Sequence, residues 1–366
     1  MTLPTSIDKR LGRGDSRVPN HDHPGSSARA SRCKGKSEKP HLIPGSMRFA
    51  PSRSQGRPPL RVVLHHHITS RLSSLVDRLG VSTTPAVFEA HIRRMARDYE
   101  VVGLDAVLSG NLPRRSLLLT FDDGYRSFVE TALPVLRRLG LPSVLFVTGA
   151  CLDPCILPLD NLLSYLCASV GLERLAAALN PHAPPPRTFL QLLDLVAAMP
   201  YSRSLGLGSE LSARFELDQA ALRAESGLFL DPQDLTGLAE DGCEVANHTR
   251  SHLFCRAFPD EEAAYDQIVE NARRLESLSG RRVRAFSYPY GRRDDATPMI
   301  ERVLRESGHE ASFLAESRHH PTGSSGRLWN RVRLDGYATW RIGAELELMP
   351  ALRGGRDWLR DTAQMA

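Results

Sequence analysis

The chain lacks any hydrophobic run long enough to cross a membrane, since no stretch of its 366 residues stays apolar for the roughly 18 residues that a spanning helix needs. It also lacks the apolar core of about 7–15 residues that a secretory signal carries. Cysteine is scarce, and the scatter of the six cysteines matches neither a disulfide framework nor a zinc ribbon. We therefore expect reduced thiols, no transmembrane segment and a cytoplasmic location.

Acidic residues are few in the first 59 residues, where twelve Lys and Arg stand against four Asp and Glu. A basic segment of this kind can bind nucleic acid or anionic lipid. Its richness in Ser, Pro, Gly and Arg is, however, typical of solvated, disordered chain. We predict a disordered leader at 1–59 with no nucleic-acid partner. The residues before Met47 are either a tail or the product of a start codon assigned too early.

From residue 60 onward, strand-like and helix-like segments alternate along the chain. Residues 116–121 (SLLLTF) form an uninterrupted apolar run, which suits a strand buried on both faces of a parallel sheet. Repeated βα units predict such a sheet, and about seven strands favour a closed barrel. The alternation breaks at about 151–230, where a Leu- and Ala-rich stretch predicts a helical insertion. The other segments expected are strands at 61–64, 142–147, 244–246, 283–288 and 311–315, and helices starting at Pro85 and covering 260–278 and 297–307.

Residues 120–125 (TFDDGY) place two adjacent aspartates at the end of the buried strand. Acidic residues there are costly unless a partner such as a metal ion compensates their charge. Neighbouring side chains diverge, so one aspartate can bind a metal while the other faces substrate. Gly124 permits the sharp turn that follows. Taken alone, the motif is equally well explained as a turn that caps a helix.

Residues 248–252 (HTRSH) follow another predicted strand. Two histidines four residues apart can share one helical face and converge on one metal ion. Imidazole together with carboxylate suits zinc and related divalent ions. The alternative is a pair of exposed loop histidines.

Two further segments follow predicted strands. In residues 287–291 (SYPYG), Pro and Gly predict a rigid turn, and the aromatic rings can stack on a sugar. Residues 65–67 are three consecutive histidines directly after the first strand, and such a run is either a metal site or chance. Strand ends are where parallel α/β barrels place their active sites.

Together these segments resemble the polysaccharide deacetylase (NodB-homology) family, carbohydrate esterase family 4, over roughly residues 60–335. TFDDGY matches the family's first motif in full, and HTRSH matches its second, His-Ser/Thr-x-x-His. SYPYG matches the third only in part, because Tyr288 stands where many members carry arginine. The resemblance implies a distorted (β/α)7 barrel in the α/β class, here with a helical insertion.

The resemblance also implies a site and a reaction. Asp123, His248 and His252 would bind a divalent metal ion, best matched by Zn²⁺, and Asp122 would be the general base. The backbone N–H of Tyr290 would help to hold the oxyanion formed from the acetamide. The expected activity is removal of N-acetyl groups from an N-acetylated glycan.

Two departures from the family pattern concern the catalytic acid and the missing arginine. The usual late Leu-x-His segment is absent, but some relatives carry a Tyr-His pair after their first strand, and His66 aligns with that histidine. We predict His66 as the acid, with an imidazole nitrogen within about 5–8 Å of the metal. His65 or His67 remain alternatives, since neighbours on a strand face opposite sides.

Arg331 lies in a segment that resembles a late Arg-Ile/Val segment of these relatives and is predicted to orient Asp122.

Two other functions stay open at this point. One is an enzyme of the same fold acting on a small amide or imide, which a closed pocket would favour over a long cleft. The other is a non-catalytic carbohydrate-binding relative, which the intact set of candidate catalytic residues disfavours. In either case we expect a deacetylase-like domain at 60–345 and a C-terminal tail at 346–366.

Overall fold

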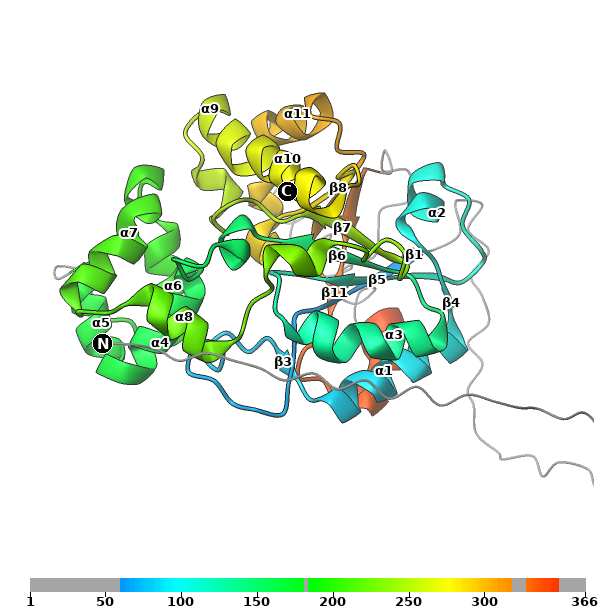
Figure 1. Cartoon of the computed structure of the whole chain (residues 1–366), viewed down its shortest axis with the longest axis horizontal. Coiled ribbons are helices and arrows are strands. Elements are labelled where there is room, and N and C mark those ends of the chain that lie inside the picture. The colour runs from blue at the N-terminus through cyan, green and yellow to red at the C-terminus, as the bar shows by residue number, and fades with distance from the viewer. Residues whose placement is uncertain (1–59, 181–183, 318–326, 349–366) are drawn as a thin grey trace, which may run out of the picture. The chain divides into compact units, whose positions relative to one another are not determined.

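The computed structural model describes residues 60–180, 184–317 and 327–348 (Figure 1). The predicted leader and most of the predicted C-terminal tail lie outside these residues. None of the helices in the described ranges combines the length and the apolar character that crossing a bilayer requires.

A nine-stranded parallel sheet forms the centre of the fold. Its path runs β10-β9-β8-β7-β6-β5-β1-β11, and β4 pairs with the beginning of β5. Two short strands, β2 (His67–Ile68) and β3 (Ser82–Thr83), pair separately. The strands of the main sheet are β1 (Leu60–His65), β4 (Glu100–Val101), β5 (Ser116–Phe121), β6 (Ser143–Val147), β7 (Cys243–Asn247), β8 (Ala285–Ser287), β9 (Ala311–Leu314), β10 (Leu328–Asn330) and β11 (Val332–Arg333).

One extended segment joins the two edges of the sheet. β10 pairs with β9, β11 pairs with β1, and only Arg331 separates β10 from β11. The sheet therefore nearly closes on itself, and this confirms the expected α/β class and the barrel of the (β/α)7 type. Because every pairing is parallel, the carboxyl ends of the strands gather at one mouth.

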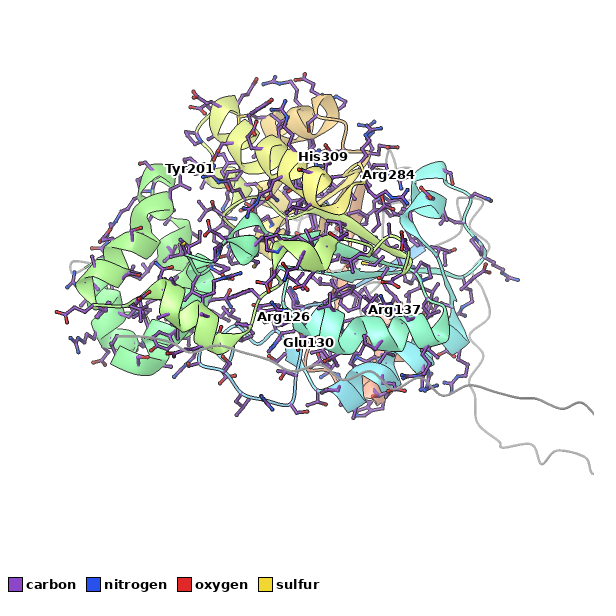
Figure 2. The ribbon with its side chains drawn as sticks, viewed as in Figure 1. Arg126, Glu130, Arg137, Tyr201, Arg284 and His309 are labelled. Carbon is purple, nitrogen blue, oxygen red and sulfur yellow. The ribbon has the colours of Figure 1, made fainter. Side chains whose placement is uncertain are left out.

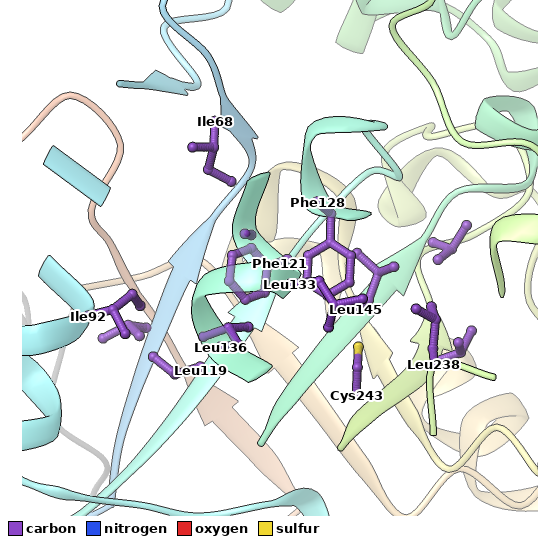
Figure 3. Packing of buried hydrophobic residues seen from close by; sticks show 14 of the residues in the cluster. Ile68, Ile92, Leu119, Phe121, Phe128, Leu133, Leu136, Leu145, Leu238 and Cys243 are labelled. Carbon is purple, nitrogen blue, oxygen red and sulfur yellow. The ribbon is translucent and has the colours of Figure 1, made fainter. Parts of the chain in front are cut away.

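Apolar residues cover both faces of the strands. In β5, Leu118 packs inside the barrel. Leu119 and Phe121 pack outward against helices, and Figure 3 shows these two residues in their cluster. This confirms the reading of the SLLLTF run as a strand buried on both faces. The helices around the barrel are α1 (Pro85–Asp98), α2 (Leu104–Ser109), α3 (Leu133–Leu139), α9 (Glu261–Ala264), α10 (Glu270–Ser279) and α11 (Pro298–Glu306).

The predicted insertion is helical, and its apolar residues form a cluster together with Leu75, Val76, Val81 and Tyr125. Where the chain returns from it, Arg126 contacts Asp231 at 2.6 Å and Arg137 pairs with Asp241 (Figure 2). These ion pairs attach the returning segment to the chain around α3. The helices of the insertion are α4 (Leu159–Val170), α5 (Leu172–Leu179), α6 (Phe189–Ala197), α7 (Tyr201–Arg214) and α8 (Gln219–Ser226).

Two of the expected elements need correction. The predicted strand at 283–288 is only three residues long, because the chain turns at Pro289 to begin a 3-10 helix, η6 (Pro289–Gly291). The predicted continuous helix at 260–278 is interrupted by a π-helical turn, η5 (Tyr265–Val269), between α9 and α10. Periodicity in the sequence does not distinguish a π turn from an α turn, because the turn adds only one residue to the hydrogen-bonded ring.

Candidate active site

The two aspartates after β5 are buried, and each has its own surroundings. The backbone N–H of Asp122 bonds the carbonyl of His65, which extends the β1–β5 pairing by one residue. The chain then turns sharply, with φ of 77° at Asp123 and 112° at Gly124. A Cβ on Gly124 would lie 3.2 Å from that of Cys151, so a larger residue would be strained there.

His248 and His252 converge on Asp123. Their Nε2 atoms lie 3.5 and 3.3 Å from the same oxygen, Asp123 Oδ1. The potential ligand atoms of the three residues all lie within 4.8 Å of one another, and all three residues are buried. Asp123 Oδ1 has no aligned hydrogen-bond donor in the described part of the chain. A carboxylate oxygen that faces a cation does not need such a donor. The donor set therefore fits one divalent ion.

The expectation that the two histidines share a helical face is wrong. Residues 248–252 form a loop after β7, and both Thr249 and His252 have positive φ, at 63° and 54°. The two rings meet because the backbone reverses, with ring centroids 5.0 Å apart. The spacing of four residues therefore brings the imidazoles together by a different geometry.

Each of these histidines has its other ring nitrogen next to an oxygen. His248 Nδ1 lies 2.9 Å from the carbonyl oxygen of Ser287, and His252 Nδ1 lies 3.3 Å from Asp160 Oδ2. Such contacts fix the ring orientation and the tautomer, so that Nε2 is directed at the metal position. Asp160 comes from α4 of the insertion and was not predicted from the sequence. No motif singles it out, because its partner lies more than ninety residues later in the chain.

Arg331 binds Asp122 through two parallel hydrogen bonds, with Nη1–Oδ1 at 2.6 Å and Nη2–Oδ2 at 2.7 Å. Both side chains are buried. Burial by itself raises the pKa of the Asp122 carboxyl, but the Arg331 guanidinium outweighs it, so this pKa lies below its usual value. Tyr288, which stands where relatives carry arginine, is buried and donates its hydroxyl hydrogen bond to Glu301.

Of the three consecutive histidines, His66 is the one whose ring contacts a carboxylate, that of Asp335. Its Nδ1 lies 2.6 Å from Asp335 Oδ2, and its backbone N–H bonds Asp335 Oδ1 at 3.1 Å. Burial by itself lowers the pKa of His66, but the carboxylate of Asp335 outweighs it, and Asp123 and Asp122 add to this effect, so the pKa lies above its usual value. Asp335 was not predicted from the sequence, although it lies only four residues after Arg331.

The neighbours of His66 face elsewhere. His65 is fully buried among the outward-facing aromatic rings, with its centroid 5.9 Å from that of Phe121 and 5.2 Å from that of Phe88. Burial lowers its pKa to about 4. His67 contacts the Ser82 hydroxyl in the small β2–β3 sheet. His66 is therefore the histidine of the three whose ring pairs with a carboxylate, and its role as the acid stays a prediction.

Tyr290 occupies the turn after β8 with φ of 61°. Its ring stacks on Phe254, with centroids 3.9 Å apart, and lies 4.9 Å from the ring of His252. Gly291 follows with φ of 63°, and a Cβ there would lie 2.1 Å from the backbone nitrogen of Ala315. The close approach of β9 therefore excludes any side chain at 291 and holds the tight turn.

The mouth of the barrel thus combines an ionised carboxylate, a donor set for one divalent ion and a histidine paired with a carboxylate. These are the parts of a hydrolase that cleaves an amide or ester bond, with one group to accept a proton and another to donate one.

The chain belongs to the polysaccharide deacetylase family, whose family model matches residues 109–312. It is accordingly a hydrolase that acts on carbon–nitrogen bonds other than peptide bonds. The match includes Asp122, Asp123 and the HTRSH segment, whereas His66 and Arg331 lie outside it. Membership sets aside the alternative of a carbohydrate-binding relative without catalytic activity.

Solved structures share the fold at low sequence identity. A polysaccharide deacetylase from Bacillus cereus is similar with a TM-score of 0.51 and 12% identity, over 79% of this chain and 69% of that chain. A de-N-acetylase from Aggregatibacter actinomycetemcomitans is similar with a TM-score of 0.51 and 13% identity, over 78% of this chain and 99% of that chain. No match was found among curated proteins.

Proposed function

We propose that this chain is a metal-dependent deacetylase that removes N-acetyl groups from a glycan polymer. The observation that carries the proposal is the position of Asp123 Oδ1 between the Nε2 atoms of His248 and His252, next to the Arg331-bound carboxylate of Asp122. Asp123, His248 and His252 would hold the ion. Zn²⁺ is the best match, since this ion takes imidazole and carboxylate ligands and three protein ligands leave positions open.

When bound, a divalent ion lowers the pKa of water and polarises the carbonyl of the acetamide. Asp122 is then the group that accepts the proton of the attacking water. Its ion pair with Arg331 supports this role in two ways, because it keeps the carboxyl ionised and fixes its two oxygens by a bidentate contact.

His66 is the proposed acid. A leaving amine is too basic to depart without a proton, and the carboxylate of Asp335 raises the pKa of His66, so the imidazole keeps its proton to a higher pH than a free histidine would. Arg331 therefore favours the ionised form of the base, and Asp335 favours the protonated form of the acid. The backbone N–H of Tyr290 is the proposed donor to the oxyanion.

Two observations support a glycan as the proposed substrate. One is the family, and the other is the pair of stacked rings of Tyr290 and Phe254 beside His252. Tyr290 is half-buried, and its ring lies next to the ring of His252, where we expect it to contact an apolar sugar face. A small amide, the other substrate considered, would not need this surface.

An acetate-release assay tests the proposal. The full chain is stripped with a chelator, reloaded with Zn²⁺, and offered N-acetylated glycans, O-acetylated glycans and small cyclic amides. Because ring opening of a cyclic amide releases no acetate, its product is followed separately by chromatography. We expect activity on the N-acetylated glycans that disappears on chelation and returns with metal. Acetate release that survives complete metal removal, or turnover of the cyclic amides alone, would contradict the proposal.

A further inference from the structure

The backbone of the loop that carries His248 and His252 has a conformation that residues other than glycine rarely adopt. Thr249 and His252 are not glycines, yet both have positive φ. A β-branched residue such as Thr249 is rarely found there, because its Cβ approaches the backbone closely. The surrounding structure must therefore hold this conformation in place.

Every backbone amide of the loop has a specific acceptor. His248 N–H bonds the carbonyl of Val147 at 3.1 Å, and Thr249 N–H bonds Asn247 Oδ1 at 3.1 Å. His252 N–H bonds the hydroxyl oxygen of Thr249 at 3.1 Å. Of the three amides between the histidine ligands, the remaining two, those of Arg250 and Ser251, both bond one residue outside the loop.

That residue is Gln267, which is fully buried. Its backbone carbonyl accepts from Arg250 N–H at 2.8 Å, and its side-chain Oε1 accepts from Ser251 N–H at 3.0 Å. Its side-chain Nε2 lies 3.3 Å from the hydroxyl oxygen of Ser251. One residue thus binds the middle of the loop through both its backbone and its side chain.

Gln267 lies in the π-helical turn η5, and the turn explains how this is possible. A π turn interrupts the regular i→i−4 pattern, so its carbonyls can accept donors from outside the helix. Two consecutive carbonyls do so, because that of Gln267 accepts from Arg250 and that of Ile268 accepts from the Asn247 side chain at 2.8 Å. π turns of this kind are frequent at functional sites.

The other side of the loop is held as well. Its carbonyls at Thr249 and Arg250 accept from the N–H groups of Gly149 at 3.0 Å and Ala150 at 2.7 Å. The loop is therefore bonded between the segment after β6 and the π turn, while the side chains of His248 and His252 are left free to face Asp123.

We infer that Gln267 is a positioning residue for the metal centre, and that the π turn η5 sets the histidine loop in its metal-binding shape before the ion arrives. The inference rests on the proposed metal site and deepens it. Gln267 touches neither ion nor substrate; it acts through the backbone of Arg250 and Ser251. Supporting groups of this kind typically change metal affinity by about 10–100-fold when they are removed.

The test compares two glutamine variants of the full chain, Q267M and Q219M. Gln219 in α8 makes the same type of contacts, since its Oε1 accepts from Leu157 N–H and its Nε2 donates to the Ser212 hydroxyl, both at 2.8 Å. It lies in the insertion and contacts no residue of the loop 248–252. Zn²⁺ affinity is measured by competition with a chromogenic chelator, and the geometry of the site by the visible spectrum of the Co²⁺-loaded chain.

We expect Q267M to bind Zn²⁺ about 10–100-fold more weakly and to shift the Co²⁺ spectrum, whereas Q219M leaves both unchanged. Equal weakening by both variants, or no change in Q267M, would overturn the positioning role. A wild-type chain that binds no Zn²⁺ would instead overturn the metal site itself and this inference with it.

Amide hydrogen exchange is a second test. It uses the wild-type chain and therefore does not depend on the folding of a variant. In the metal-free protein, the amides of 248–252 should already exchange slowly, because the acceptors described above belong to the protein. Protection that develops only when Zn²⁺ is added would mean that the ion, and not Gln267, shapes the loop, and would overturn the inference.

Discussion

Asp122 and Asp123 are adjacent residues with different partners, because the turn at Gly124 sends their side chains in different directions. The Asp122 carboxylate binds Arg331 and the Asp123 carboxylate faces His248 and His252. Both carboxylates also lie near His248 Nε2, with Asp122 Oδ2 at 3.6 Å and Asp123 Oδ1 at 3.5 Å, but only that of Asp122 is bound by Arg331.

Asp122→Asn is predicted to keep the metal and to lose about 10²–10⁴-fold in turnover, the usual contribution of general-base catalysis. Metal content by elemental analysis and acetate release by a coupled assay check the two parts separately. Asp123→Asn is the matched variant and should lose the metal as well. An Asp122→Asn chain with normal turnover would show that another group accepts the proton.

His66→Ala is predicted to lower turnover at normal metal content. Because His66 must be protonated to donate, kcat/KM should fall as pH rises through its raised pKa. Asp335→Asn removes the carboxylate that raises this pKa, so it should move the alkaline limb of the pH profile to lower pH. A limb that stays in place in Asp335→Asn would mean that a different group supplies the proton.

Among the elements, the segment from β10 to β11 links the closure of the barrel to the chemistry. Arg331 lies between two short strands that pair with opposite edges of the sheet, and from there it reaches Asp122. The insertion contributes in a similar way, because α4 places Asp160 beside His252. Elements that are far in sequence from the motifs at 120–125 and 248–252 thus complete the site.

Asp160→Asn is predicted to weaken Zn²⁺ binding by about tenfold or more, because an amide orients His252 less firmly than a carboxylate does. Competition titration with a chelator measures the change. Asp194→Asn, in α6 of the same insertion, is the control, since Asp194 is paired with Arg292 at the surface and should not affect metal affinity. If the wild type, Asp160→Asn and Asp194→Asn bound Zn²⁺ with equal affinity, Asp160 would have no role in the metal centre.

For the whole molecule, we propose that residues 60–345 form the catalytic domain. Deleting residues 1–46 should leave the fold and the activity on a soluble substrate intact, because that segment has too little apolar content to contribute to a core. Thermal unfolding and acetate release of the shortened chain measure this. A shortened chain that failed to fold or lost activity would assign the segment a role.

The stability of the whole domain should fall in acid. Burial holds the pKa of His65 at about 4 in the folded chain, against about 6.5 when unfolded, so the unfolded state binds more protons between these values. The contribution of His65 is complete above about pH 6.5 and is lost as the pH falls toward 4. The shift corresponds to about 3 kcal/mol.

His65→Phe should therefore flatten the acid limb of a plot of unfolding free energy against pH, since phenylalanine keeps the ring contacts with Phe88 and Phe121 but takes up no proton. Urea unfolding at a series of pH values from 4 to 7 provides the plot. Parallel curves for the wild type and the variant would mean that other groups cause the loss.

The sequence by itself determined the order of the βα units, the helical insertion and the family, together with Asp122, Asp123, His248 and His252. These features depend on apolar periodicity and on motifs within a few residues of one another. The family resemblance also predicted roles for His66 and Arg331. Only the tertiary structure showed the bidentate contact of Arg331 with Asp122, the pairing of His66 with Asp335, and the contacts of Asp160 and Gln267 with the loop 248–252. These contacts join residues from different elements, and closure of the barrel by the segment from β10 to β11 brings Arg331 to Asp122.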